Sequence, residues 1–85
     1  MQTTVEISMY PFHEDYKTRI RGFIDALNKR DGLEVYTTAT CTLVHGEHAT
    51  VMDALKELTA WSHAEHGRGV FVTKIIPGFP KPEAT

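Results

Sequence analysis

The amino-acid sequence predicts an α+β fold whose strands and helices follow the order β-α-β-β-α-β. Alternating apolar and polar side chains over residues 4–10 indicate a strand, and an apolar stripe with helical spacing begins at Tyr16. Two strand patterns, a helical pattern and a last strand follow between residues 33 and 76. Because two cores would not fit in 85 residues, we expect one domain over residues 1–78 and a Pro-rich tail over residues 79–85.

The first strand and the first helix have the clearest patterns. Residues 4–10 place Val, Ile and Met on one face of a strand, which Pro11 ends because proline cannot continue a sheet ladder. Gly32 is suited to a left-handed C-cap, so the helix that begins at Tyr16 ends just before it. The side chains of the apolar stripe on this helix are Tyr16, Ile20, Phe23, Ile24 and Leu27.

The middle of the chain predicts a hairpin and a second helix. Residues 33–45 are rich in Thr, Val and Leu and contain neither Gly nor Pro. One strand of that length would extend about 43 Å, beyond the usual range, so we expect two strands joined near residues 38–41. Gly46 breaks the strand pattern, Thr50 is a suitable N-cap for the helix that follows, and Gly67 ends that helix.

The order of elements predicts a ferredoxin-like βαββαβ sandwich, with a four-stranded antiparallel sheet in the order 4-1-3-2 and both helices on one face. The last strand, residues 70–76, is apolar on both faces, although an open antiparallel face is normally polar. Exposed apolar area of this kind usually marks an interface. We therefore expect a second copy to cover the open face, giving a homodimer or a homotetramer.

Charge and apolar run length exclude several classes of partner. Nine Lys and Arg residues are scattered among eleven Asp and Glu residues, so no nucleic-acid surface is expected. The longest apolar runs have three or four residues, whereas a membrane span needs about 20. Because a strand pattern follows directly after residues 1–3, we expect no signal peptide, and Cys41 has no partner for an intramolecular disulfide. We expect a cytoplasmic protein.

Histidine and cysteine are the residues most able to carry metal or nucleophilic chemistry. His45 and His48 have H-x-x-H spacing, as do His63 and His66, and such a pair on a helix shares one face. Both pairs lie at element ends without a cysteine cluster, so we expect neither a native metal site nor a cofactor. Cys41 is interpreted as a small packed residue, and no catalytic motif is present.

Hydroxyl groups gather at one end of the predicted sheet. The strand order places Ser8 and Tyr10, at the end of the first strand, beside Thr42 at the start of the third, with Thr38 close by. Hydroxyls donate and accept hydrogen bonds, which suits recognition of a neutral heterocycle. Threonines are also common in strands for their β-propensity alone, and composition favours neither interpretation.

Two stretches carry a family resemblance. Ile7-Ser8-Met9-Tyr10-Pro11 ends the first strand, and Thr42-Leu43-Val44-His45-Gly46-Glu47 leads into the second helix. Together with Gly32-Leu33-Glu34-Val35 they resemble the thiamine-binding, YkoF-like family over residues 4–78. The resemblance implies a ferredoxin-like domain without catalysis that binds thiamine or its hydroxymethylpyrimidine moiety. It also implies that Thr42 contacts the pyrimidine, although Cys41 stands where Ser or Gly is usual.

We therefore expect non-enzymatic binding of thiamine or hydroxymethylpyrimidine, in transport, salvage or sensing. The hydroxyls of Thr42, Ser8 and Thr38 would hydrogen-bond the aminopyrimidine, and Tyr10 would supply an aromatic wall. The candidates to face a thiazolium cation are the acidic residues Glu6 and Glu47. Two alternatives stay open, namely a small dimeric α+β-barrel enzyme of the monooxygenase or isomerase type, and a purely structural oligomeric module.

Overall fold

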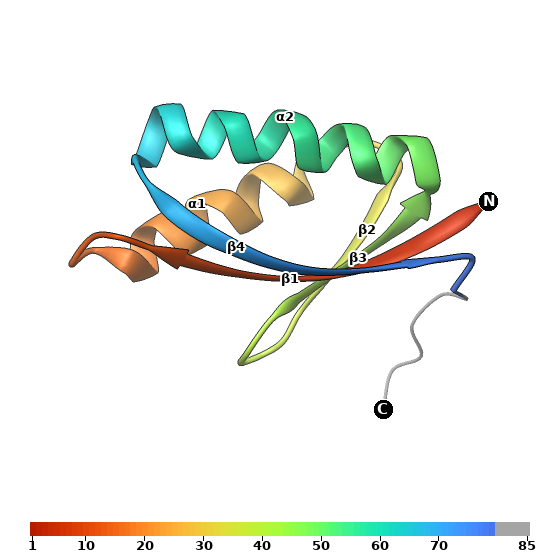
Figure 1. The fold of residues 1–85 in the computed structure, drawn as a ribbon, viewed down its shortest axis with the longest axis horizontal. Helices are drawn as coiled ribbons and strands as arrows, with labels where there is room; N and C mark the ends of the chain where they lie inside the picture. Colours follow the sequence, from red (N-terminus) through yellow and green to blue (C-terminus); the bar gives the residue numbers. More distant parts are fainter. Residues whose placement is uncertain (80–85) are drawn as a thin grey trace.

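The computed structural model describes residues 1–79 and confirms the ferredoxin-like α+β architecture (Figure 1). The four strands form one antiparallel sheet in the order β2-β3-β1-β4, and both helices lie on the same face of it. Apart from Phe79, the expected Pro-rich tail lies outside the described residues. The elements are β1 (Gln2–Pro11), α1 (Tyr16–Asn28), β2 (Leu33–Thr37), β3 (Thr42–Glu47), α2 (His48–His66) and β4 (Gly69–Pro77).

The central strand β1 pairs with a neighbour on each side, but over unequal lengths. Its ladder with β4 runs as far as Pro11↔Gly69, whereas its ladder with β3 ends at Ile7↔Thr42. The β2–β3 ladder also ends at Thr42, where Thr37 is the partner. Beyond Ile7, the hairpin between β2 and β3 therefore diverges from β1, as Figure 1 shows.

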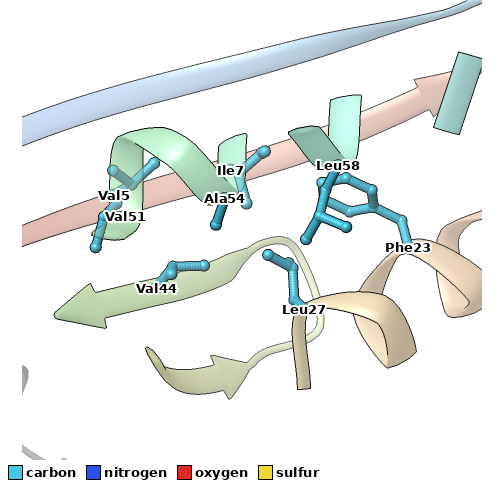
Figure 2. Close-up of a cluster of buried hydrophobic side chains, with 8 residues drawn as sticks. All are labelled: Val5, Ile7, Phe23, Leu27, Val44, Val51, Ala54 and Leu58. Carbon is cyan, nitrogen blue, oxygen red and sulfur yellow. The ribbon is translucent and has the colours of Figure 1, made fainter. Parts of the chain in front are cut away.

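The hydrophobic core lies between the helices and the middle of the sheet (Figure 2). Alternation along each strand sends every second side chain toward the helices, so Val5 and its ladder partner Val44 are both fully buried. Phe23 packs against Phe71, with ring centroids 4.8 Å apart. The buried apolar side chains are Val5, Ile7, Phe23, Leu27, Val44, Val51, Ala54 and Leu58.

The start of α2 differs from the sequence-based prediction. The helix begins at His48, with Glu47 at the N-cap position, so Thr50 lies inside the helix and is not its cap. Gly46 does not break the strand either, because it lies within β3. A Cβ atom at Gly46 would lie 2.6 Å from the carbonyl oxygen of Gly32. This glycine allows the loop before β2 to pass close to β3.

On the open face of the sheet, β4 presents three apolar side chains, as predicted, with Lys74 between two of them. Val70, Val72 and Ile76 project from that face with exposures of 43%, 52% and 39%. Ile75 lies on the helix side of the same strand, opposite Val5, and is also exposed. Neither helix within residues 1–79 is long and apolar enough to cross a membrane.

Two arginines connect the helices. The Arg19 guanidinium donates a hydrogen bond to the carbonyl of His66, at the C-terminal end of α2, where helix carbonyls lack intrahelical partners. Arg30, just after α1, donates to the Glu57 carboxylate over 2.7 Å. This hydrogen bond, and the positive charge of Arg30, lower the pKa of Glu57 below its ordinary value.

The close approach at Gly46 predicts a specific sensitivity to added volume. Gly46→Ala should lower the free energy of unfolding by about 1–3 kcal/mol, because the new methyl group meets backbone that cannot rotate away. Gly22→Ala is the matched control, since its Cβ would meet only the movable ring end of His66 and alanine favours the helix by about 1 kcal/mol. Urea denaturation measures both variants. Equal losses at the two positions would contradict this account.

The Arg30–Glu57 contact predicts a pH dependence. Because the pKa of Glu57 is lowered in the folded state, the contact stabilises the fold above the ordinary carboxyl pKa, and this contribution is lost as the pH falls through the lowered value. Glu57→Gln should therefore lower the free energy of unfolding slightly at neutral pH and less at acid pH. The effect is small because solvent screens exposed pairs. Denaturant titrations at the two pH values measure this difference in the free energy of unfolding, and Glu65→Gln is the control. A loss of stability that does not depend on pH would refute the prediction.

Candidate functional site

A cavity of about 330 Å³ lies between α1, the last residues of β1 and the hairpin that joins β2 and β3. Its walls are residues 7–11, residues 37–42 and the apolar stripe at the start of α1. The cavity exists because the β1–β3 ladder ends at Ile7↔Thr42. Past that pair β1 and the hairpin are no longer paired, and the cavity lies between them and α1.

Thr42 is the polar side chain at the inner end of this cavity. It starts β3, lies opposite the core residue Ile7, and is only 6% exposed. Its hydroxyl makes no hydrogen bond with any residue in the described part of the chain. The hydroxyl is not among the fully buried side-chain atoms that lack a partner, which within residues 1–79 are Arg19 Nε and His66 Nε2, so it keeps access to the cavity. The Thr42 hydroxyl is therefore available to a bound molecule.

Thr38 lies at the cavity but uses its hydroxyl within the turn of the hairpin. The hydroxyl oxygen accepts hydrogen bonds from the backbone N–H groups of Cys41 (3.1 Å) and Thr40 (3.3 Å). The hydroxyl proton is donated to the carbonyl of Cys41 over 3.0 Å. Thr38 thus shapes the wall formed by the turn.

Ser8 and Tyr10 also line the cavity, as the strand order predicts. The Ser8 hydroxyl donates to the carbonyl of Thr40 over 3.2 Å and connects β1 to the turn beyond the last ladder pair. Tyr10 lies at the rim and is 57% exposed, so its ring is accessible to a ligand and to solvent. The structure therefore brings Ser8, Tyr10, Thr38 and Thr42 together at one cavity.

The acidic residues considered for the site lie elsewhere. Glu47 is at the opposite end of β3, where its carboxylate lies 3.1 Å from the amino group of Met1. Glu6 lies 3.6 Å from the amino group of Lys74. No residue that lines the cavity carries a charged side chain. The site is therefore uncharged, with an apolar lining and a few hydroxyls.

The four histidines with H-x-x-H spacing do not converge on one point. His45 Nδ1 is 2.8 Å from the hydroxyl of Thr4, and His48 Nδ1 is 2.8 Å from the hydroxyl of Thr3. These contacts satisfy polar groups at the end of the sheet away from the cavity. Within residues 1–79, no group of three His, Cys, Asp or Glu side chains is placed to hold a metal ion.

The sequence interpretation did not include the helix wall of the cavity. The sequence predicts one apolar stripe on α1 without dividing it between core and cavity, but Tyr16 is 48% exposed and lines the cavity with Ile20 and Ile24. Phe23 belongs to both the core and the cavity wall. The available signal was Tyr16 itself, since a residue with an apolar body and a polar tip suits the edge of a core.

Solved structures of the same fold come from several organisms. A Thermotoga maritima protein named "putative thiamine biosynthesis/salvage protein" is 27% identical, covering 89% of this chain and 83% of its own, with a TM-score of 0.79. A hypothetical protein from Methanocaldococcus jannaschii is 24% identical, covering 98% and 87%, with a TM-score of 0.77. A Bacillus cereus domain of unknown function, DUF77, is 19% identical, covering 88% and 74%, with a TM-score of 0.74.

These similarities are structural. No protein-family model matches the chain, and no curated protein matches it. The Methanocaldococcus and Bacillus structures, both below 25% identity, show the fold alone. Taken together, the Thermotoga and Bacillus structures support a YkoF-like fold for this chain.

Proposed function

We propose that this chain binds thiamine or its hydroxymethylpyrimidine moiety, without catalysing a reaction on it, in transport, salvage or sensing. The observation that carries the proposal is the hydroxyl of the largely buried Thr42, which makes no hydrogen bond within residues 1–79 and lines an uncharged cavity. A hydroxyl of this kind can donate one hydrogen bond and accept others. It therefore matches the edge of an aminopyrimidine, where donors and acceptors lie side by side.

The shape and lining of the cavity suit a small flat ring. Its volume of about 330 Å³ is near the lower end of the range for small-molecule sites, roughly 300–1,000 Å³. Tyr10 and Tyr16 offer aromatic faces at the rim, and Ile20 and Ile24 offer apolar surface from the helix. Polar recognition at Thr42 combined with apolar walls is the usual arrangement of a heterocycle site.

The absence of charge in the lining distinguishes the two candidate ligands. Hydroxymethylpyrimidine is neutral, whereas the thiazolium ring of thiamine is a cation. No carboxylate lines the cavity, so a thiazolium would depend on the rings of Tyr10 and Tyr16 or on solvent. We therefore expect the pyrimidine half to be recognised in the cavity and the thiazolium half to add little affinity.

The same lining supports binding without catalysis. General acid–base catalysis relies most often on His, and also on Asp, Glu, Lys, Tyr or Cys, with a pKa suited to the operating pH. No His, Asp, Glu or Lys lines the cavity, and only Tyr and Cys represent these residue types there. The thiamine-related name of the Thermotoga protein, which shares 27% identity with this chain, points to the same class of ligand.

Isothermal titration calorimetry with hydroxymethylpyrimidine and with thiamine tests the proposal. Thr42→Val keeps the size of the side chain and removes the hydroxyl, so it should weaken binding by roughly two- to tenfold, the effect of one neutral hydrogen bond of about 0.5–1.5 kcal/mol. Thr73→Val on β4, away from the cavity, should leave affinity unchanged. The absence of binding at millimolar concentrations, or equal affinity of the wild type and Thr42→Val, would contradict the proposal.

We also propose that a second copy of this chain covers the open face of the sheet. Val70, Val72 and Ile76 give that face an exposed apolar strip. Glu6 and Lys74 lie side by side on the same face, so a two-fold axis would let each acid meet a base of the partner. A chain of 85 residues buries only about two-thirds of its surface alone, and pairing would increase that fraction.

Light scattering with size-exclusion chromatography tests this assembly. Val72→Lys puts a charge on the apolar strip and should shift the protein toward the 9.6 kDa monomer. Ile75→Lys is the matched control, because it lies on the same strand with similar exposure but on the helix side. A wild-type protein that elutes as a monomer at all concentrations, or equal dissociation of both variants, would refute the proposal.

A further inference from the structure

We propose that a second copy of this chain on the open face of the sheet also closes the cavity, so that ligand binding and assembly strengthen each other, an inference that rests on the proposed function. The cavity is then complete only in the assembled protein. Two features of the fold support this. The lining of the cavity comes from both faces of β1, and its open-face residues are ladder partners of the apolar residues of β4.

The lining of the cavity includes side chains from both faces of β1. Ile7 lines it from the helix side and belongs to the core. Ser8 and Tyr10 line it as well, but they lie on the open face. Their ladder partners on β4, Val72 and Val70, project from that same face. A paired sheet would separate the two sides, whereas β1 and the hairpin are unpaired beyond Ile7, so the cavity reaches the open face.

Little of the described chain closes the cavity on its open-face side. The Ser8 hydroxyl spans the gap to the hairpin through its hydrogen bond to the Thr40 carbonyl. Tyr10 stands beside this gap and is exposed. A ligand in the single chain would therefore keep part of its surface in water, whereas small-molecule sites usually bury about 70–90% of a ligand. A surface packed against this side would remove that contact with water and add to the affinity.

The second copy is in the right place to supply the missing wall. Tyr10 is the ladder partner of Val70, and Ser8 is the ladder partner of Val72. Adjacent strands are about 4.8 Å apart, so a surface that covers the two valines also reaches the two cavity residues. The inner side chains of two sheets that pack face to face interdigitate and exclude water. Pairing through the apolar strip would therefore complete the cavity.

The charges on the open face favour a second copy over a different partner. Glu6 and Lys74 lie 3.6 Å apart on this face, and Lys74 lies between Val72 and Ile76. A two-fold contact places the same patch on both copies, so that each acid meets a base of the partner. The patch is thus complementary to itself in both charge and apolar surface.

The coupling works in both directions. If pairing tightens ligand binding by some factor, saturating ligand must tighten pairing by the square of that factor, because two copies hold two sites. Coupling between sites is usually at least about fivefold, which corresponds to a change of about 25-fold in the dissociation constant of the pair. The pairing state of the chain would then report the ligand concentration, which is what a sensing protein requires.

Calorimetry with hydroxymethylpyrimidine on a chain that cannot pair tests the coupling. Ile76→Lys puts a charge on the apolar strip at the ladder partner of Thr4, about 13 Å along β1 from Ser8. It should give a monomer in light scattering and weaken binding at least about fivefold, through loss of pairing. Ile75→Lys, on the same strand but on the helix side, should keep both pairing and affinity. A monomeric Ile76→Lys chain with wild-type affinity would overturn this inference and leave the proposed function intact.

The wild-type protein provides a second test that needs no substitution. Light scattering with saturating hydroxymethylpyrimidine should show the dissociation constant of the pair lowered by about 25-fold. A pairing equilibrium that the ligand leaves unchanged would overturn the coupling, as would a wild type that binds the pyrimidine while monomeric at all concentrations. If the paired wild type does not bind the pyrimidine, the proposed function fails, and the coupling fails with it.

Discussion

The end of the β1–β3 ladder at Ile7↔Thr42 is the constraint on which the site depends. Up to that pair, β1 holds the sheet together and the helices cover a closed core. Beyond it, β1 continues along β4 alone as far as Pro11, and the hairpin is held to it by the Ser8–Thr40 hydrogen bond. The cavity opens at this separation, and the same pair that ends the ladder places the Thr42 hydroxyl at its inner end.

Most of the fold was predictable because hydrophobic periodicity reports directly on which face of an element is buried. The strand and helix order, the faces of β4 and the hairpin near residues 38–41 were all predicted and are confirmed. The predictions at Gly46 and Thr50 were wrong for one reason. A reading of local sequence treats a glycine as the end of a strand. In the structure, Gly46 stays within the strand because its missing side chain lets the Gly32 carbonyl pass close by, and α2 starts directly after that strand.

The candidate site was only partly predictable. Strand order alone places Ser8, Tyr10 and Thr42 near one another, and the structure brings them to one cavity. The helix wall around Tyr16 was not predicted, because a continuous apolar stripe does not reveal where the sheet beneath it ends. Nor does the sequence show that the carboxylate of Glu47 lies near the amino group of Met1, at the opposite end of β3.

The central claim is that a neutral pyrimidine is recognised where the ladder ends. Backbone amide chemical shifts followed by nuclear magnetic resonance during titration with hydroxymethylpyrimidine test it most directly. The account predicts saturable shifts concentrated at residues 8–10 and 38–42, with little change near the Thr4–His45 contact at the other end of the sheet. Shifts centred on His45 and Glu47, or no saturable shifts at all, would contradict it.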